Sequence, residues 1–132
     1  MIRLDENTYE ITMTQYDFGV PITLDAYKAD GFNVGERVVF VFRTDKIASK
    51  MFDIDEEEYK INLVFDEAEV NRLFDRNIET HRNIRYSIKR YKWDEEQQKY
   101  QFLESLENDN GESVFNLKVT GTVRYNGEAE ST

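Results

Sequence analysis

The sequence is poor in the residue types that carry most catalytic and redox chemistry. It contains no cysteine, one proline and a single histidine, His81. Without cysteine there are no disulfides, thiolate metal sites, iron–sulfur clusters or cysteine nucleophiles. His81 lies in the polar segment 79–83, where a surface loop position is expected. No Gly-x-Ser-x-Gly turn surrounds any serine, so no hydrolase triad is predicted.

Positive charge and long apolar runs are also scarce. The chain has 17 Lys and Arg against 27 Asp and Glu, a formal net charge of −10. This balance repels phosphate backbones and excludes nucleic acid as a favoured partner. No apolar run approaches the length of a bilayer span, and residues 1–6 carry acids where a signal peptide needs a basic region. We therefore expect no membrane partner, and assembly in the cytoplasm.

The many acidic residues form no recognisable cation or nucleotide site. The run Asp53–Glu58 begins like a calcium-binding loop, but Glu58 replaces the required glycine and Val64 the bidentate glutamate. Gly31 and Gly35 lack the spacing and the following Lys of a phosphate-binding loop. The number of acids does not by itself create a glycosidase pair. The sequence predicts no metal, no cofactor and no enzymatic activity.

Aromatic residues and period-two patterns are abundant. Aromatics make up 14% of the 132 residues, which favours strands within one domain. Alternating or continuous apolar segments bounded by turn residues predict about seven short strands. They lie at Ile11–Thr14, Val20–Ala26, Val38–Phe42, Tyr59–Phe65, Ile84–Ile88, Tyr100–Phe102 and Phe115–Tyr125.

At Asp66 the apolar period changes from two to about 3.6. Asp66 and Glu69 have the spacing of a capping box, and Phe65 and Val70 that of a hydrophobic staple. These signals predict one short helix that begins at Glu67 and ends near residue 77.

Together these elements predict an all-β fold, an antiparallel immunoglobulin-like β-sandwich with one short helix. The domain is expected to cover residues 1–126, and residues 127–132 are expected to form a disordered C-terminal tail. A small β-barrel is the alternative architecture.

One segment stands out as a candidate interface or ligand face. Alternation directs Ile84, Tyr86 and Ile88 inward, so that Tyr91 and Trp93, beyond an expected change of phase at Arg90, are left exposed. The basic residues Arg85, Lys89 and Arg90 gather on the same segment. Exposed rings suit a protein interface or a sugar- or peptide-binding face, although core positions explain them too. The charge pattern suits docking of identical copies or of an oppositely charged partner, or a solvated strand face.

Four segments resemble a known family. They are Glu10–Leu24, Glu36–Arg43, Tyr59–Leu73, and the closing pair Ile84–Arg90 with Asn116–Val123. Their order is similar to the N-terminal immunoglobulin-like domain of phage baseplate upper proteins and related phage or prophage tail structural proteins. The segment 75–83 is longer than the connection of that family.

The resemblance implies a non-catalytic structural protein of the virion tail or baseplate, assembled in the bacterial host cytoplasm. It further implies contacts with other phage structural proteins and a homo-oligomer, a trimer or hexamer. The alternative function is a carbohydrate- or peptide-binding β-sandwich module.

Overall fold

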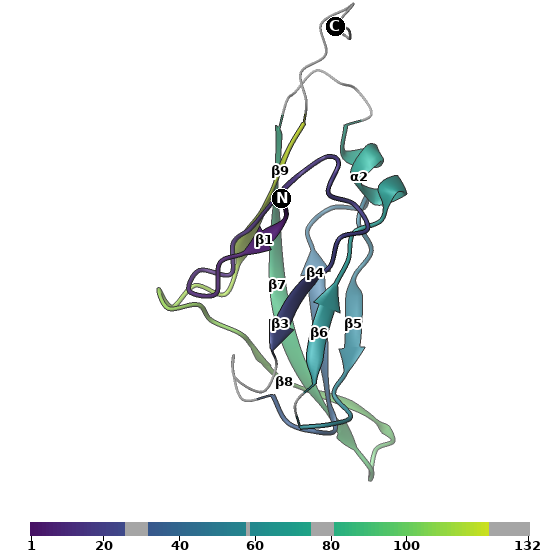
Figure 1. The fold of residues 1–132 in the computed structure, drawn as a ribbon. Helices are drawn as coiled ribbons and strands as arrows, with labels where there is room; N and C mark the ends of the chain where they lie inside the picture. Colours follow the sequence, from purple (N-terminus) through teal and green to yellow (C-terminus); the bar gives the residue numbers. More distant parts are fainter. Residues whose placement is uncertain (26–31, 58, 75–80, 122–132) are drawn as a thin grey trace, which may run out of the picture.

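The computed structural model describes residues 1–25, 32–57, 59–74 and 81–121 (Figure 1). Within these ranges the chain is mostly β-strand with one short helix, which confirms the all-β prediction. The strands are β1 (Arg3–Leu4), β2 (Ile11–Thr14), β3 (Ile22–Asp25), β4 (Glu36–Phe42), β5 (Lys50–Asp53), β6 (Lys60–Leu63), β7 (His81–Asp94), β8 (Lys99–Ser105) and β9 (Phe115–Thr120), and the helix is α2 (Glu67–Leu73).

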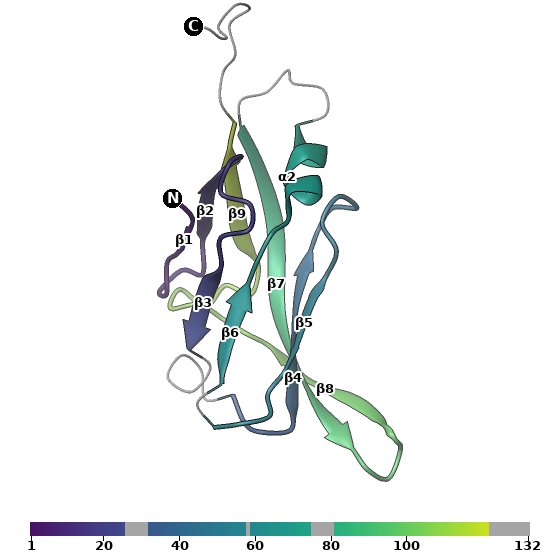
Figure 2. The ribbon, with the colours of Figure 1, turned by 45° about the vertical axis from the view of Figure 1, so that its right-hand side comes forward.

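The strands form a large sheet and a small one. The large sheet has seven strands in the order β1–β2–β9–β7–β4–β5, with β8 paired to β7. The small sheet is the antiparallel pair β3–β6, which lies over one face of the large sheet (Figures 1 and 2). We call the face of the large sheet that contacts β3–β6 the inner face, and the opposite one the outer face.

The large sheet is mixed rather than purely antiparallel. Strand β2 pairs with β9 in parallel, from Ile11 opposite Leu117 to Thr14 opposite Thr120. All other described strand pairs are antiparallel. A parallel pair needs a long connection between its strands, and most of the chain separates β2 from β9. Alternation in the sequence predicts which side chains share a face. It does not predict whether two strands so distant in the chain pair in parallel or antiparallel.

Strand β7 organises the large sheet along its whole length. One edge of β7 pairs with β4 over residues 86–92. The other edge pairs first with β9 over residues 81–86 and then with β8 over residues 89–94. The β7–β8 hairpin therefore extends past the end of β9, and Figure 2 shows it projecting from the body of the molecule.

The buried hydrophobic residues that the structure describes form one core between the two sheets. Its aromatic part brings together Tyr9, Phe40, Phe42, Tyr86 and Phe115, with ring centroids 5.1–6.2 Å apart between neighbours. The buried aliphatic residues of β3 and β6 complete it from the small sheet. The alternate side chains that pack together in this core define the inner face of each strand.

Helix α2 begins at Glu67, as predicted. The Asp66 carboxylate accepts the Glu69 backbone N–H at 2.7 Å, and the Glu69 carboxylate accepts the Asp66 N–H at 3.1 Å, so the capping box is formed. Val70 and Leu73 are buried against the core. The helix ends at Leu73, earlier than predicted, and residues 75–77 of the predicted helix lie outside the described residues.

The structure contains two short strands that the sequence did not predict, β1 and β5. Strand β5 has no alternation of apolar and polar residues, because the apolar Met51 points to the solvent-exposed side, where a polar residue is expected. Strand β1 has only two residues, too few to form a pattern. Strand β9 ends at Thr120, so Gly121 is no longer in the strand. Residues 122–125 of the predicted strand, the tail 127–132 and most of the segment 75–83 lie outside the described residues.

Candidate interaction surface

Four of the five predicted face residues lie in one row on the outer face of β7. Successive side chains of a strand point to opposite faces, and Tyr86 and Ile88 are fully buried on the inner face. The alternate positions therefore face outward. This outer row consists of Arg85, Ser87, Lys89, Tyr91 and Trp93.

The fifth residue, Arg90, points to the inner face and has a structural role. Its guanidinium bonds both carboxylate oxygens of Glu36, at 3.0 and 2.7 Å, and also bonds Glu104. The Arg90 and Glu36 side chains are only 13% and 5% exposed. Burial opposes ionisation of Glu36, but the hydrogen bonds from Arg90 and Asn33 outweigh it and lower the pKa of Glu36. Arg90 is occupied in neutralising a buried acid.

The irregularity expected at Arg90 lies in the neighbouring strand. The pairing of β7 with β8 shifts between Arg90 and Tyr91, because Arg90 faces Glu104 and Tyr91 faces Phe102. The extra residue is thus Leu103 of β8. Strand β7 itself pairs with β4 in unbroken register, so its alternation continues through Trp93.

The end of the outer row joins an exposed aromatic patch, formed by Tyr91, Trp93, Tyr100 and Phe102. The Tyr91 and Phe102 ring centroids are 5.6 Å apart and those of Trp93 and Tyr100 5.1 Å, both with interplanar angles of 68°. Phe102 is 55% exposed and Trp93 36% exposed. These two edge-on pairs hold large apolar rings at the surface of the projecting hairpin.

Residues from distant segments extend this patch. The Arg37 guanidinium of β4 lies 4.0 Å from the centroid of the Tyr100 ring. Arg37 is fixed there by two hydrogen bonds to Asp53 of β5, at 2.6 and 3.1 Å, and these lower the pKa of Asp53. The sequence offered no signal for Arg37 or Asp53, because only the pairing of β4 with β5 and β7 brings them to the hairpin.

The other end of the outer row is cationic. Arg43 follows β4, and its backbone N–H donates to the Arg85 carbonyl at 2.8 Å, which places the two residues side by side. In the described part of the chain, Arg43, Arg85 and Lys89 make no side-chain hydrogen bond or ion pair. We call these three residues the cationic cluster. Uncompensated cations are notable in a chain whose net charge is −10.

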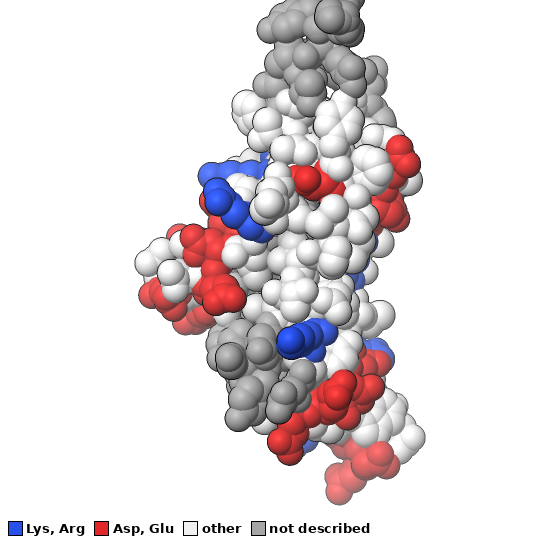
Figure 3. All heavy atoms as spheres, viewed as in Figure 1, with Lys and Arg blue, Asp and Glu red and all other residues white. Residues whose placement is uncertain are grey.

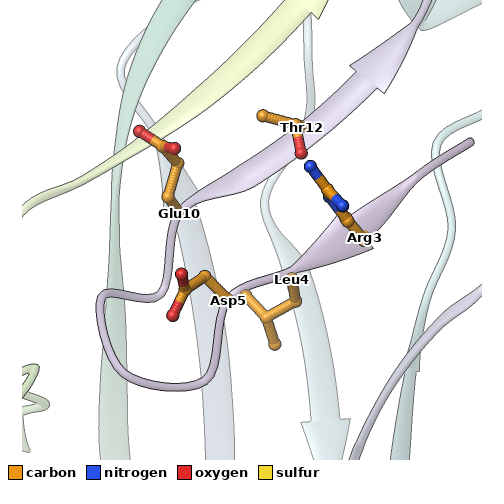
Figure 4. Close-up of a pocket in the computed structure, with 5 residues that line it drawn as sticks. All are labelled: Arg3, Leu4, Asp5, Glu10 and Thr12. Carbon is orange, nitrogen blue, oxygen red and sulfur yellow. The ribbon is translucent and has the colours of Figure 1, made fainter.

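Polar hollows lie near the same end of the sheet. One, of about 340 Å³, is lined by Arg3, Leu4, Asp5, Glu10 and Thr12 on the β1–β2 hairpin (Figure 4). Figure 4 shows Arg3 directed towards Thr12, whereas the carboxylates of Asp5 and Glu10 lie apart from it and from each other. The side chains do not converge on a common point.

An adjoining hollow of about 330 Å³ is bordered by Arg85 together with Asp5, Glu10 and Glu112. Each of these acids already has a local partner. Asp5 accepts the backbone N–H groups of residues 7 and 8, Glu10 pairs with Lys118 at 3.0 Å, and Glu112 accepts from Asn108 at 2.8 Å. The hollow is therefore a crease between turns and gives no catalytic arrangement.

Other possible sites receive little support from the described residues. His81 begins β7 and is exposed. Within the described ranges no group of three or more His, Asp or Glu side chains is arranged to hold a metal ion. The described part of the chain also has no helix of the length and apolarity needed to cross a bilayer. Figure 3 shows acidic side chains over several loops of the face that carries β3 and β6.

Comparisons with protein-family models, with curated proteins and with solved structures find no match to this chain.

Proposed function

We propose that this chain is a non-catalytic, immunoglobulin-like structural module that acts through protein–protein contacts, as part of a phage or prophage tail or baseplate. The aromatic patch on the projecting β7–β8 hairpin is the observation that carries the docking role. The phage assignment rests on the resemblance of strand order and segments described above.

The strand arrangement supports an immunoglobulin-like sandwich. In that fold one sheet contains strands C, F and G and the other contains B and E. Here β4, β7 and β9 are neighbours in the large sheet, while β3 and β6 pair separately across the core. Strand β5 then extends the large sheet beside β4, as C′ does in the variable-type domain. The parallel β2–β9 pair is an addition to the antiparallel pattern.

The composition of the hairpin favours protein contacts. Interface cores are enriched in Tyr, Trp, Phe, Met and Arg, and aromatic side chains lose little conformational entropy on binding. The aromatic patch supplies four rings, with Arg37 stacked on one of them. Met51 of β5, which pairs with Val39 on the outer face, is 60% exposed and adds a further apolar side chain to that face of the large sheet. Figure 2 shows that the hairpin extends beyond the small sheet, so no other described strand or helix covers its tip.

A carbohydrate- or peptide-binding module remains the alternative, because Trp93 is exposed. The ring geometry favours it less for sugars. A pyranose stacks on a flat ring face, but each ring pair here is inclined by 68° and forms no shared plane. A fluorescence titration of Trp93 with a glycan panel distinguishes the two functions, since a saturable response supports the alternative.

The direct test is to purify virions from the producing cells and to quantify this polypeptide by mass spectrometry against a tail-tube protein. We expect a fixed stoichiometric ratio. A Trp93→Ala/Phe102→Ala variant is expected to be lost from the particles, while Val20→Ala, an exposed apolar residue outside the hairpin, is retained. Absence of the wild-type chain from intact particles would overturn the phage assignment.

A further inference from the structure

We propose that the outer row of β7 is a docking surface for an acidic, extended segment of another protein. Carboxylates of that segment bind the cationic cluster around Ser87, and its next apolar side chains pack on the aromatic patch. This inference rests on the proposed docking function and specifies the partner's chemistry.

The spacing of side chains along β7 matches that of an extended segment. Arg85, Ser87 and Lys89 occupy alternate positions, so their Cα atoms follow each other at about 7 Å on one face. Tyr91 and Trp93 continue the row at the same interval. A segment in extended conformation has the same repeat, and its alternate side chains meet the row one by one.

Ser87 gives the second, independent observation. It is only 8% exposed, and its hydroxyl has no hydrogen-bond partner in the described part of the chain. It lies between two cations on its own strand and opposite Val41 of β4. A buried hydroxyl without a partner is costly, and it becomes satisfied when it donates to an anion seated between Arg85 and Lys89.

The third observation is charge complementarity. Within the described ranges Arg43, Arg85 and Lys89 have no carboxylate partner, although acids outnumber bases in the whole sequence by 27 to 17. The three acids that line the hollow beside Arg85 are each held by other groups. Two guanidinium groups and one ammonium group matched to carboxylates give orientation and specificity, and the adjoining rings supply apolar area.

Other occupants fit less well. Nucleic acid is disfavoured because the overall charge of −10 repels a polyanion that extends beyond three cations. A second copy applied through the same face would bring no carboxylate to the cationic cluster, because the outer row contains no acidic residue. A short acidic segment of a different chain meets neither obstacle.

The test uses the whole chain and an acetylated, fluorescein-labelled peptide, Glu-Thr-Glu-Thr-Phe-Thr-Phe-Thr, whose alternate residues present two acids and then two rings. Its matched control has Gln in place of both Glu residues. Fluorescence anisotropy at low ionic strength is expected to show saturable binding of the acidic peptide. We expect the Gln peptide to bind at least about tenfold more weakly, because charged hydrogen bonds are lost.

Variants of one strand locate the site. Arg85→Gln and Lys89→Gln are each expected to weaken binding about fivefold or more, and Ser87→Ala about threefold. Lys92→Gln is the matched control, because Lys92 is an exposed lysine on the same strand but on the opposite face. It is expected to change binding less than twofold. Thermal unfolding of all four variants establishes that they fold like the wild type.

Several results would overturn the inference. They are no binding of the acidic peptide at millimolar concentration, equal binding of the Gln peptide, equal losses for Lys89→Gln and Lys92→Gln, or tighter binding of oligothymidylate. Self-association that is lost in Lys89→Gln, seen by sedimentation, would instead identify a second copy as the occupant. Retention of the chain in virions decides the proposed function separately, so the two failures are distinguishable.

Discussion

The phenol hydroxyl of Tyr86 donates a 2.5 Å hydrogen bond to the backbone carbonyl oxygen of Tyr9. Tyr86 is fully buried in the middle of β7, and Tyr9, with a φ of 60°, lies in the turn before β2. Burial raises the pKa of Tyr86, so the phenol stays protonated and remains a donor. This bond ties the N-terminal hairpin to the central strand.

The first prediction removes that hydroxyl. Tyr86→Phe preserves the ring packing but leaves the buried Tyr9 carbonyl without this donor, and we expect a loss of about 1–3 kcal/mol in the free energy of unfolding. Urea denaturation measures the change. Tyr91→Phe, on the outer face, is the control and is expected to stay within about 0.5 kcal/mol of the wild type. Equal losses for the two substitutions would show that the buried hydrogen bond does not contribute to the free energy of unfolding.

The second prediction separates Arg90 from the interaction surface. Arg90→Ala leaves the buried Glu36 carboxylate without its main partner, and we expect a loss of about 3 kcal/mol in the free energy of unfolding. Lys92→Ala, two residues along the strand, is expected to change it by less than about 0.5 kcal/mol. The double variant Glu36→Gln/Arg90→Gln should recover part of the loss, since no buried charge remains. If Arg90→Ala matched Lys92→Ala, the structural role of Arg90 would be wrong.

The third prediction concerns acid stability. The pKa of Glu36 in the folded chain lies below its ordinary value of 4.5. Just below pH 4.5 Glu36 binds a proton in the unfolded chain but not in the folded chain. The contribution of Glu36 to the free energy of unfolding is therefore fully present above pH 4.5 and is lost as the pH falls through the pKa of the folded state. Urea midpoints measured from about pH 7 to about pH 3 should fall more steeply for the wild type than for Glu36→Gln. Parallel pH profiles would contradict the assignment.

The fourth prediction tests the start of α2. Asp66→Ala removes the N-cap, and we expect a loss of about 1 kcal/mol in the free energy of unfolding, whereas Asp66→Asn retains an acceptor and costs less. Glu69→Ala is expected to cost more than Asp66→Ala. The reason is that the Glu69 carboxylate, 4% exposed, also binds the Lys50 ammonium at 2.7 Å and the Ala48 N–H at 3.2 Å. Thermal or chemical denaturation ranks the three variants, and a reversed order would show that the cap outweighs this buried pair.

Local patterns in the sequence determined much of the secondary structure. Alternation located β2, β3, β6 and β9, a continuous apolar run located β4, and the change of period with the Asp66–Glu69 spacing placed the first residue of α2. These features depend on residues that lie only a few positions apart in the sequence, so they can be predicted without knowledge of the fold. The sequence grouped Arg85, Lys89, Tyr91 and Trp93 on one segment and predicted a change of phase at Arg90. In the structure the four residues share one face because the alternation continues unbroken along β7.

Tertiary structure decided which strands became neighbours and therefore what each side chain meets. It placed β2 parallel to β9 and turned Arg90 towards the buried Glu36. It brought Arg37 to the β7–β8 hairpin and Arg43 to Arg85 of β7, both far away in the sequence. It also left Ser87 buried between Arg85 and Lys89, two cations without an ion-pair partner among the residues that the structure describes. Strand pairing joins residues of any separation, and its energy depends on the whole set of contacts, so no local pattern specifies it. The sequence alone determined the faces of the strands; only the assembled sheets determined the surface they form.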